Sequence, residues 1–301
     1  MMNSPLVSIL TITYNRANLI HRCIESIQKQ TYINYEHIIV DGNSSDNTEE
    51  VVKSYHDSHI KYFKLNTSGP QVQMRAGANE AIGKYVSFLD DDDEYLPNKI
   101  EKQVSLFETL PEDYGIVYCW MSYYNNDNPE KEISIHKTEL RGFVGDIAPS
   151  RPLVSGTPTM MIRRNVFEEF GGTYDDSIGF IGADWELMTR ICQKYKVEYV
   201  PESLVKVYVN HEYARLSTDF YSDKARKGII FHNHFLKTFK DCFDRHPQYA
   251  QYHFNALCRY YFTLGNIHET ARYFKLYLST YPSLRSVLSL LKFFVFGNKY
   301  A

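Results

Sequence analysis

The fold is decided by residues 6–41, which read LVSILTITYNRANLIHRCIESIQKQTYINYEHIIVD. Residues 6–13 form a β-rich apolar run, and residues 17–30 then place their apolar side chains on one helical face. The period changes back at residues 35–41, which are typical of a second strand. A strand, a helix and a strand in such close succession predict a β–α–β unit with two parallel strands.

The same alternation continues along the first part of the chain. Helical patterns at residues 46–56 and 71–83 alternate with strand patterns at residues 60–65 and 84–90. This repetition predicts an α/β fold with a mostly parallel sheet and helices on both of its faces.

The pattern changes in the later part of the chain. From about residue 114 to residue 208 strand and helix signals are mixed, and after about residue 219 the strand signal fades. Four helical stretches follow, the first over residues 224–243. The sequence therefore predicts a first domain over residues 1–220 and a C-terminal α-helical region over residues 221–301.

Composition narrows the classes of partner. The chain has 301 residues, of which 44% are hydrophobic, so it can bury a sizeable core. Its formal net charge of -3 gives no broad electrostatic basis for binding nucleic acid, and we expect no nucleic-acid partner.

Cysteine usage and the apolar segments bear on the compartment. The five cysteines are odd in number and widely spaced, which is typical of a reducing compartment. The N-terminal residues carry no basic stretch of the kind that opens a secretion signal. The most apolar segment, SVLSLLKFFVFG, is short and includes Lys292, so we expect no membrane span. We expect a cytoplasmic protein, and a peripheral contact at the inner face of the cell membrane is left open.

Polar residues follow the predicted strands of the first domain. Asn15 follows the first strand, residues 41–46 the second, residues 66–70 the third and residues 90–94 the fourth. In open parallel sheets ligands bind where the loops after the strands converge. We therefore expect the functional site at this edge of the sheet.

The sharpest local feature is the acidic run at residues 90–94, DDDDE, directly after an apolar strand. Adjacent carboxylates repel one another, and a cation can offset their charge. Carboxylate oxygens suit Mg²⁺ or Mn²⁺, and these ions complete their ligand shells with substrate phosphates. The alternative is a solvated acidic turn, and the position at the end of a strand favours a metal site.

Four segments together resemble the family 2 glycosyltransferases, which have the GT-A fold. They are VSILTITYNR, HIIVDGNSSDNTEEVV, GANEAIGKYVSFLDDDDEYLP and GADWELMTRIC, in the order and approximate spacing of that family. The resemblance implies a metal-dependent transferase that moves a sugar from a nucleoside-diphosphate sugar, by preference a UDP-sugar, to a hydroxyl of a saccharide or lipid-linked saccharide. It also implies inversion at the sugar and a place in assembling a surface polysaccharide or related glycoconjugate.

The resemblance also implies which residues bind the nucleotide. In that family the end of the first strand holds the nucleotide, and Thr13, Tyr14 and Asn15 match it; Asp41 matches an acid after the second strand. A carboxylate can accept the imide N–H of uracil, and a tyrosine ring can stack on a base. The family often has two adjacent acids where this chain has Asp41 and Gly42, so Asp41 is either the base reader or a turn residue.

The acidic run matches the family's D-x-D element at Asp90 and Asp92. By resemblance, Asp92 binds a Mn²⁺ or Mg²⁺ ion that bridges the donor diphosphate, and Asp90 contacts the ribose or the donor sugar. Asp91 is also placed among the donor-binding residues, and Asp93 is expected to contact the site through water. The extra acids leave the register of the run open.

Asp184 matches the acid that serves as catalytic base in inverting members of the family. Direct displacement at the anomeric carbon needs a carboxylate beside the acceptor hydroxyl to take its proton. Many relatives carry Glu-Asp here, whereas this chain has Ala183 before Asp184. The alternative is an exposed aspartate favoured by the dipole of the helix, and Glu186 is the fallback base.

Two further residues are assigned by position. Arg75 falls where the family often has a polar residue near the donor. It either contacts the diphosphate or is an ordinary arginine on the surface of a helix. His211 lies in a segment that resembles the family's Y-R-x-H element, and it is either a ligand of the metal or diphosphate or an ordinary loop histidine. The HNH triplet at residues 232–234 is interpreted as part of an exposed helix face.

The C-terminal region has a repeat-like spacing. Gly265, Phe274 and Pro282 follow the pattern of a tetratricopeptide-like hairpin. One such unit cannot bury its own apolar face, so it should pack on the first domain or on a neighbour, and a homo-oligomer is left open.

Two other function classes stay open at this point. A nucleotidyltransferase also needs metal-bound phosphates but needs no base at Asp184. A non-catalytic nucleotide-sugar-binding scaffold is favoured by the missing second acid after Asp41. The sequence has no G-x-x-x-x-G-K loop and no G-x-S-x-G elbow, which weakens kinase, ATPase and esterase interpretations.

Overall fold

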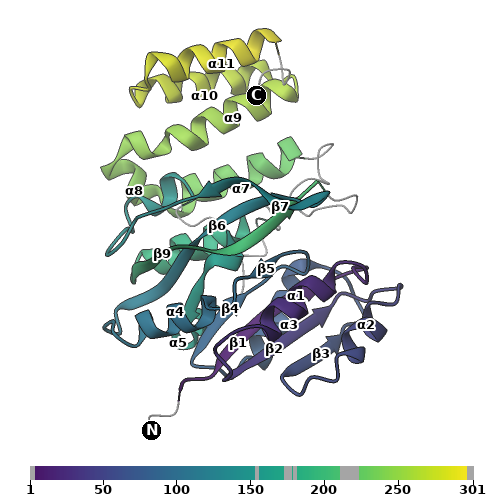
Figure 1. The fold of residues 1–301 in the computed structure, drawn as a ribbon. Helices are drawn as coiled ribbons and strands as arrows, with labels where there is room; N and C mark the ends of the chain where they lie inside the picture. Colours follow the sequence, from purple (N-terminus) through teal and green to yellow (C-terminus); the bar gives the residue numbers. More distant parts are fainter. Residues whose placement is uncertain (1–3, 153–155, 173–177, 179–181, 211–223, 297–301) are drawn as a thin grey trace. The chain divides into compact units, whose positions relative to one another are not determined.

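The chain, drawn as a ribbon in Figure 1, divides into two compact units. The structure is a computed structural model, which describes residues 4–152, 156–172, 178, 182–210 and 224–296. The first unit comprises Met1–Val144, Leu153–Tyr174 and Leu187–Tyr213. The second unit comprises Gly145–Pro152, Asp175–Glu186 and Ala214–Ala301. The predicted boundary at residue 220 lies outside the described residues, and the second unit also takes two short segments from the earlier part of the chain.

One sheet organises the first unit. Its first half is parallel and has the order β3 (Ile60–Lys64), β2 (Tyr35–Asp41), β1 (Val7–Thr13) and β4 (Tyr85–Phe88). The sheet continues with mixed pairing through β8 (Met161–Arg163), β6 (Tyr114–Asn125), β9 (Lys196–Val209) and β5 (Glu94–Tyr95), and β7 (Asn128–His136) pairs with β6. The parallel β–α alternation predicted from the sequence is confirmed for the first four strands.

Helices cover both faces of the parallel half. They include α1 (Ile20–Gln28), α2 (Thr48–Ser54) and α3 (Pro70–Glu80), and later in the unit come α4 (Lys99–Phe107) and α5 (Arg164–Glu169). Successive side chains of a strand point to opposite faces. Ile24 of α1 packs with Ile39 of β2, whereas Gly77 of α3 lies against the neighbouring Val40. The predicted α/β class with helices on both faces is therefore confirmed.

The strand order indicates at which edge of the sheet the functional site is expected. From β1 the chain moves through β2 to β3 on one side, and it then crosses to β4 on the other side of β1. Loops diverge at such a reversal and leave room for a ligand at the carboxyl ends of the strands. The segments after β1, β2 and β4, where the sequence predicted the site, meet at this reversal.

A lysine is buried in the first unit. Lys99, the first residue of α4, is fully buried, its Nζ donates to Ser87 Oγ at 2.8 Å, and it lies 3.9 Å from the centre of the Tyr95 ring. Burial disfavours the ammonium form and lowers the pKa of Lys99 to about 7.

Stability should depend on pH through Lys99. The pKa in the unfolded chain is about 10.4, so between pH 7 and pH 10 the native state binds fewer protons, and the free energy of unfolding rises by up to ~1.4 kcal/mol per pH unit. Lys99→Met should remove this contribution. Urea unfolding of the unmodified chain and of the variant at pH 7 and pH 9 measures this contribution. The free energy of unfolding of the variant should exceed that of the unmodified chain by less at pH 9 than at pH 7. An equal change in both proteins would contradict the lowered pKa of Lys99.

The second unit is mainly helical. Its helices are α7 (Lys224–Thr238), α8 (Lys240–Arg245), α9 (Gln251–Thr263), α10 (Ile267–Ser279) and α11 (Leu284–Phe296), and α6 (Ala183–Cys192) begins in it. The C-terminal helical region is confirmed, but the stretch 224–243 is two helices, because Phe239 leaves helical geometry with a ψ of 29°. Among the described residues, no helix combines the length and apolarity needed to cross a membrane.

Candidate active site

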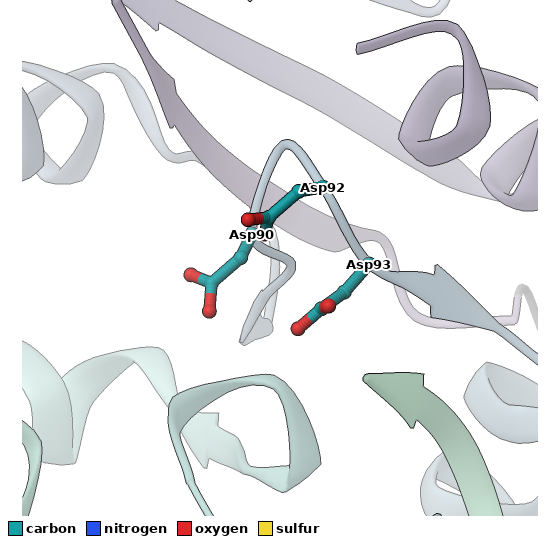
Figure 2. A group of neighbouring side chains, drawn as sticks. All are labelled: Asp90, Asp92 and Asp93. Carbon is teal, nitrogen blue, oxygen red and sulfur yellow. The ribbon is translucent and has the colours of Figure 1, made fainter. Parts of the chain in front are cut away.

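Three of the four aspartates after β4 converge (Figure 2). One carboxylate oxygen from each of Asp90, Asp92 and Asp93 lies within 4.8 Å of the others. Asp90 is exposed, whereas Asp92 and Asp93 are only 6% and 1% exposed. Carboxylates brought this close in a poorly solvated place repel one another, and a hard divalent cation relieves that repulsion. The donor set therefore fits Mg²⁺ or Mn²⁺.

The chain turns sharply to form this cluster. The Asp93 N–H donates to Asp90 O at 3.2 Å, which closes a turn, and Asp93 Oδ1 accepts the Tyr208 N–H of β9 at 3.1 Å. Arg22 of α1 donates to the backbone oxygen of Asp92 at 3.0 Å and lies 3.8 Å from the centre of the Tyr208 ring. The guanidinium of Arg22 thus ties α1, the acidic turn and β9 together.

Asp91 is not one of the three converging aspartates. It is buried, and its Oδ1 is 3.8 Å from Arg16 Nε. Burial and the neighbouring Asp92 carboxylate raise the pKa of Asp91 to about 8. The alternation of side chains along a strand predicted that Asp90 and Asp92 lie on the same side. The structure adds Asp93 to them, because a four-residue turn brings its first and last residues together. That turn signal could have identified Asp93 in the sequence.

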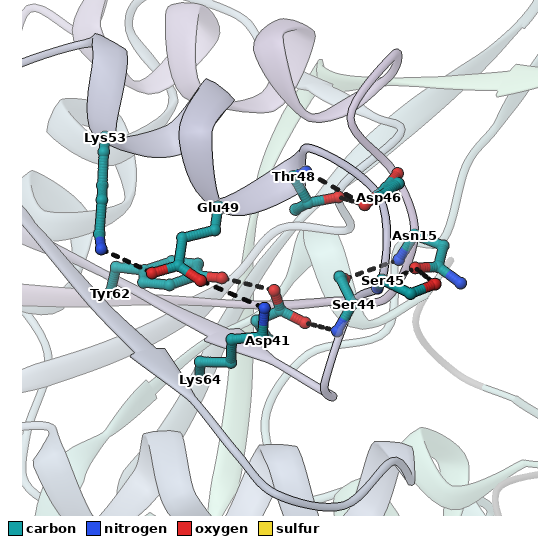
Figure 3. A network of polar contacts seen from close by, with 10 residues as sticks. All are labelled: Asn15, Asp41, Ser44, Ser45, Asp46, Thr48, Glu49, Lys53, Tyr62 and Lys64. Atoms are coloured by element: carbon teal, nitrogen blue, oxygen red, sulfur yellow. Dashed lines mark hydrogen bonds and ion pairs between the residues drawn. The ribbon is translucent and has the colours of Figure 1, made fainter.

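The loops after β1 and β2 are joined by hydrogen bonds (Figure 3). The Asn15 N–H donates to Ser44 Oγ at 2.8 Å, and Asn15 Oδ1 accepts the Ser45 N–H at 2.8 Å. Asn15 has a φ of +54°, a left-handed conformation that asparagine tolerates better than most residues. The side-chain oxygen of Asn15 therefore shapes the loop, and its contact with a nucleotide stays a prediction.

Asp41 is fully buried at the end of β2. Its Oδ1 accepts the Ser44 N–H at 2.7 Å, and the Tyr62 hydroxyl donates to its Oδ2. Burial and this hydrogen bond to Asp41 raise the pKa of Tyr62. The turn role left open by the sequence is thus present. Each carboxylate oxygen has a second lone pair, and recognition of the base by Asp41 stays a prediction.

Gly42 makes room for a buried glutamine. Gln73 of α3 donates through Nε2 to Thr13 O at 2.8 Å and to Val40 O at 2.9 Å, which joins the ends of β1 and β2. A Cβ added to Gly42 would lie 2.9 Å from the Gln73 side chain. A side chain at position 42 would therefore require the end of the Gln73 side chain to shift. Sequence reasoning missed Gln73, since nothing in the local pattern marks which helix position faces the strand ends.

The other residues predicted to bind the donor differ in how far their side chains are exposed to solvent. Thr13 is buried, whereas Tyr14 is 50% exposed, as base stacking would require. Arg75 is exposed on α3. Stacking by Tyr14 and a diphosphate contact by Arg75 stay predictions, and His211 lies outside the described residues.

The predicted catalytic base belongs to the second unit. Asp184 is half-buried in the first turn of α6, and its Oδ1 accepts the Trp185 N–H at 2.8 Å. Glu186 is fully buried, with Oε1 3.7 Å from His234 Nε2 of α7. Glu186 thus faces the helices, so the exposure of the two acids favours Asp184 over the fallback.

An aromatic cluster holds the segment that carries Asp184. The Trp185 indole donates to Ala148 O at 2.8 Å, and its ring stacks on His253 of α9 with centroids 5.4 Å apart. His253 Nε2 donates to Pro149 O at 2.7 Å, so its Nδ1 accepts from His232 Nδ1 at 2.9 Å. Burial lowers the pKa of His253 to about 4 and that of His232 to about 2.

The interpretation of residues 232–234 as an exposed face was wrong for His232, which is buried. The helical period alone does not show that His253, far along the chain, packs against that side of α7.

Comparison with known proteins identifies the family. Residues 8–171, more than half of the chain, match the family model described as Glycosyl transferase family 2. The chain belongs to this family. The predicted resemblance is therefore confirmed.

Two relatives illustrate the similarity within glycosyl transferase family 2. An uncharacterized glycosyltransferase of Rickettsia typhi is 32% identical over 69% of this chain and 65% of its own length. The chain thus spans just under two thirds of that relative. The GalNAc(5)-diNAcBac-PP-undecaprenol beta-1,3-glucosyltransferase of Campylobacter jejuni is 37% identical over 43% of this chain and 42% of its own length.

Solved structures share the fold. S. aureus TarS 1–349 in complex with UDP has a TM-score of 0.60 at 16% identity, over 91% of each chain. The mannosyltransferase PcManGT from Pyrobaculum calidifontis, in complex with GDP-Man and Mn²⁺, has a TM-score of 0.59 at 17% identity, over 97% of this chain and 80% of its own. The predicted GT-A fold is confirmed.

Proposed function

We propose that this family 2 glycosyltransferase moves a sugar from a nucleoside-diphosphate sugar, by preference a UDP-sugar, to a hydroxyl of a saccharide or lipid-linked saccharide, with inversion. The observation that carries the proposal is the three-aspartate cluster at the strand reversal between β1 and β4. A similar fold was solved with UDP, and a relative bears the name of a transferase acting on an undecaprenol-linked saccharide.

The donor side of the site is assigned to the first unit. Asp90, Asp92 and Asp93 would hold Mn²⁺ or Mg²⁺, which when bound offsets negative charge on the diphosphate. Tyr14 stacks on the base. Arg75 contacts the diphosphate as a cationic donor.

The acceptor side is assigned to Asp184. Its carboxylate takes the proton of the acceptor hydroxyl while the new C–O bond forms at the anomeric carbon and the bond to the diphosphate breaks. The proton ends on Asp184, and the electron pair leaves with the diphosphate. A single displacement of this kind inverts the configuration at the sugar.

The place of the reaction follows from the class of acceptor. We assign the transfer to the assembly of a surface polysaccharide or related glycoconjugate, at the cytoplasmic side of the cell membrane. The scaffold alternative rested on the missing second acid after Asp41. The Gln73 side chain packs against Gly42, so the glycine also has a packing role and is not by itself a sign of lost catalysis.

A donor panel tests the proposal. With Mn²⁺ present, the purified chain should release nucleoside diphosphate from one of a set of UDP-, GDP- and dTDP-sugars, and a chelator should lower the rate at least ~100-fold. Release of pyrophosphate would indicate a nucleotidyltransferase instead. Binding of UDP with no release from any donor, even with acceptor saccharides present, would support the scaffold.

A further inference from the structure

Helix α11 is apolar on two opposite faces. Its inner face packs against α9, where the Phe293 ring lies 5.9 Å from the Phe262 ring between centroids, and Leu290 is fully buried. The opposite face carries four exposed apolar side chains, here called the α11 stripe. The stripe consists of Leu284, Leu288, Leu291 and Val295, which are 75%, 49%, 41% and 73% exposed.

The spacing makes the stripe continuous. Its residues follow one another at intervals of four, three and four along α11, so they lie in one row on the helix surface. A helix that is apolar all round is normally buried, and single exposed apolar residues are ordinary whereas a continuous row is not. The α11 stripe therefore needs something to cover it.

The surrounding charge has one sign. Arg285 and Lys292, both exposed, lie seven residues apart and therefore on one edge of the stripe. The chain has no aspartate or glutamate after Glu269. Five basic residues follow that position: Arg272, Lys275, Arg285, Lys292 and Lys299.

We propose that the α11 stripe is a docking surface for an anionic lipid bilayer. An apolar row with basic residues along its edge matches a helix that lies in the plane of the membrane, with its apolar side chains at the acyl boundary and its cations at the phosphates. A symmetric pair of chains joined through α11 would bring two basic edges together with no acid of that region to pair with them. The charge therefore favours lipid over a second copy.

Vesicle flotation tests the proposal. The purified protein should float with vesicles of phosphatidylcholine mixed with phosphatidylglycerol and much less with phosphatidylcholine alone. Leu284→Ser combined with Leu288→Ser should lower the bound fraction about tenfold. Lys292→Glu should lower it at least about fivefold, and added salt should weaken binding of the unmodified chain.

Matched variants separate docking from unfolding. Ile133→Ser combined with Ile135→Ser removes two exposed apolar side chains from β7. Lys237→Glu reverses the charge of an exposed side chain of α7. Both control variants should bind vesicles like the unmodified chain. Circular dichroism should show all variants folded. The proposal is overturned if the unmodified chain floats with neither kind of vesicle, or if sedimentation shows a dimer that Leu288→Ser dissociates. Flotation and circular dichroism measure membrane binding and folding without any activity, so the outcome of this test does not depend on the transferase assignment.

Discussion

Asp184→Asn is expected to lower kcat for sugar transfer by about 10²–10⁴-fold while leaving the affinity for UDP within about twofold. The amide keeps the shape of the side chain and can still accept the Trp185 N–H that Asp184 Oδ1 accepts at 2.8 Å. It cannot take a proton from the acceptor hydroxyl. Nucleotide release with donor and acceptor gives kcat, and calorimetric titration with UDP and Mn²⁺ gives the affinity.

An exposed acid of the second unit serves as the control for this variant. Asp244 of α8 is exposed and paired with Lys240, so Asp244→Asn should leave turnover unchanged. Unchanged turnover in Asp184→Asn would show that Asp184 is not the base. Glu186→Gln would then test the fallback acid.

Removing one carboxylate from the three-aspartate cluster should have the second large effect. Asp92→Asn is expected to weaken Mn²⁺-dependent UDP binding about 100-fold, because a neutral amide replaces a charged oxygen ligand. Asp93→Asn should behave in the same way, and its amide oxygen can still accept the Tyr208 N–H. Titration of each variant with UDP at several Mn²⁺ concentrations measures the loss.

Metal-free stability distinguishes lost binding from lost folding. The cluster crowds three carboxylates within 4.8 Å, so either substitution relieves repulsion, and the melting temperature without metal should be unchanged or raised. Asp91→Asn is the matched variant, because Asp91 adjoins Asp92 but pairs with Arg16 at 3.8 Å and is not one of the three converging carboxylates; it should keep its Mn²⁺ dependence. Loss in Asp91→Asn with retention in Asp93→Asn would contradict the arrangement of the turn.

Local periodicity predicted the elements that position the site. The apolar run at residues 6–13 became β1 at Val7–Thr13, and residues 35–41 became β2 with the predicted bounds. Because β–α alternation restricts the topology, the same pattern also predicted which loops meet at the edge of the sheet. Asp90 and Asp92 followed from this reasoning, since both come directly after a buried strand.

Contacts between distant residues could not be predicted in this way. The Asp93 carboxylate is held by the N–H of Tyr208 in β9, and the packing around Gly42 is set by Gln73 of α3. Period and composition describe a residue's own helix or strand, whereas these positions are decided by a partner far along the chain. The His232–His253 pair is a further example, because burial of each ring depends on the other helix.

The second unit is assembled from three separate segments, and this has a consequence for biosynthesis. The described strands of the first unit have been translated by Val209, whereas Gly145–Pro152 and Asp175–Glu186 belong with helices that the ribosome makes later. Until α7 and α9 emerge, the indole of Trp185 lacks Phe235 and His253 as neighbours, and the carbonyl of Pro149 lacks its imidazole donor. A nascent chain stalled at this stage would expose the apolar Trp185 segment to chaperones and proteases. Premature termination should therefore give a product that is degraded rather than a smaller active enzyme.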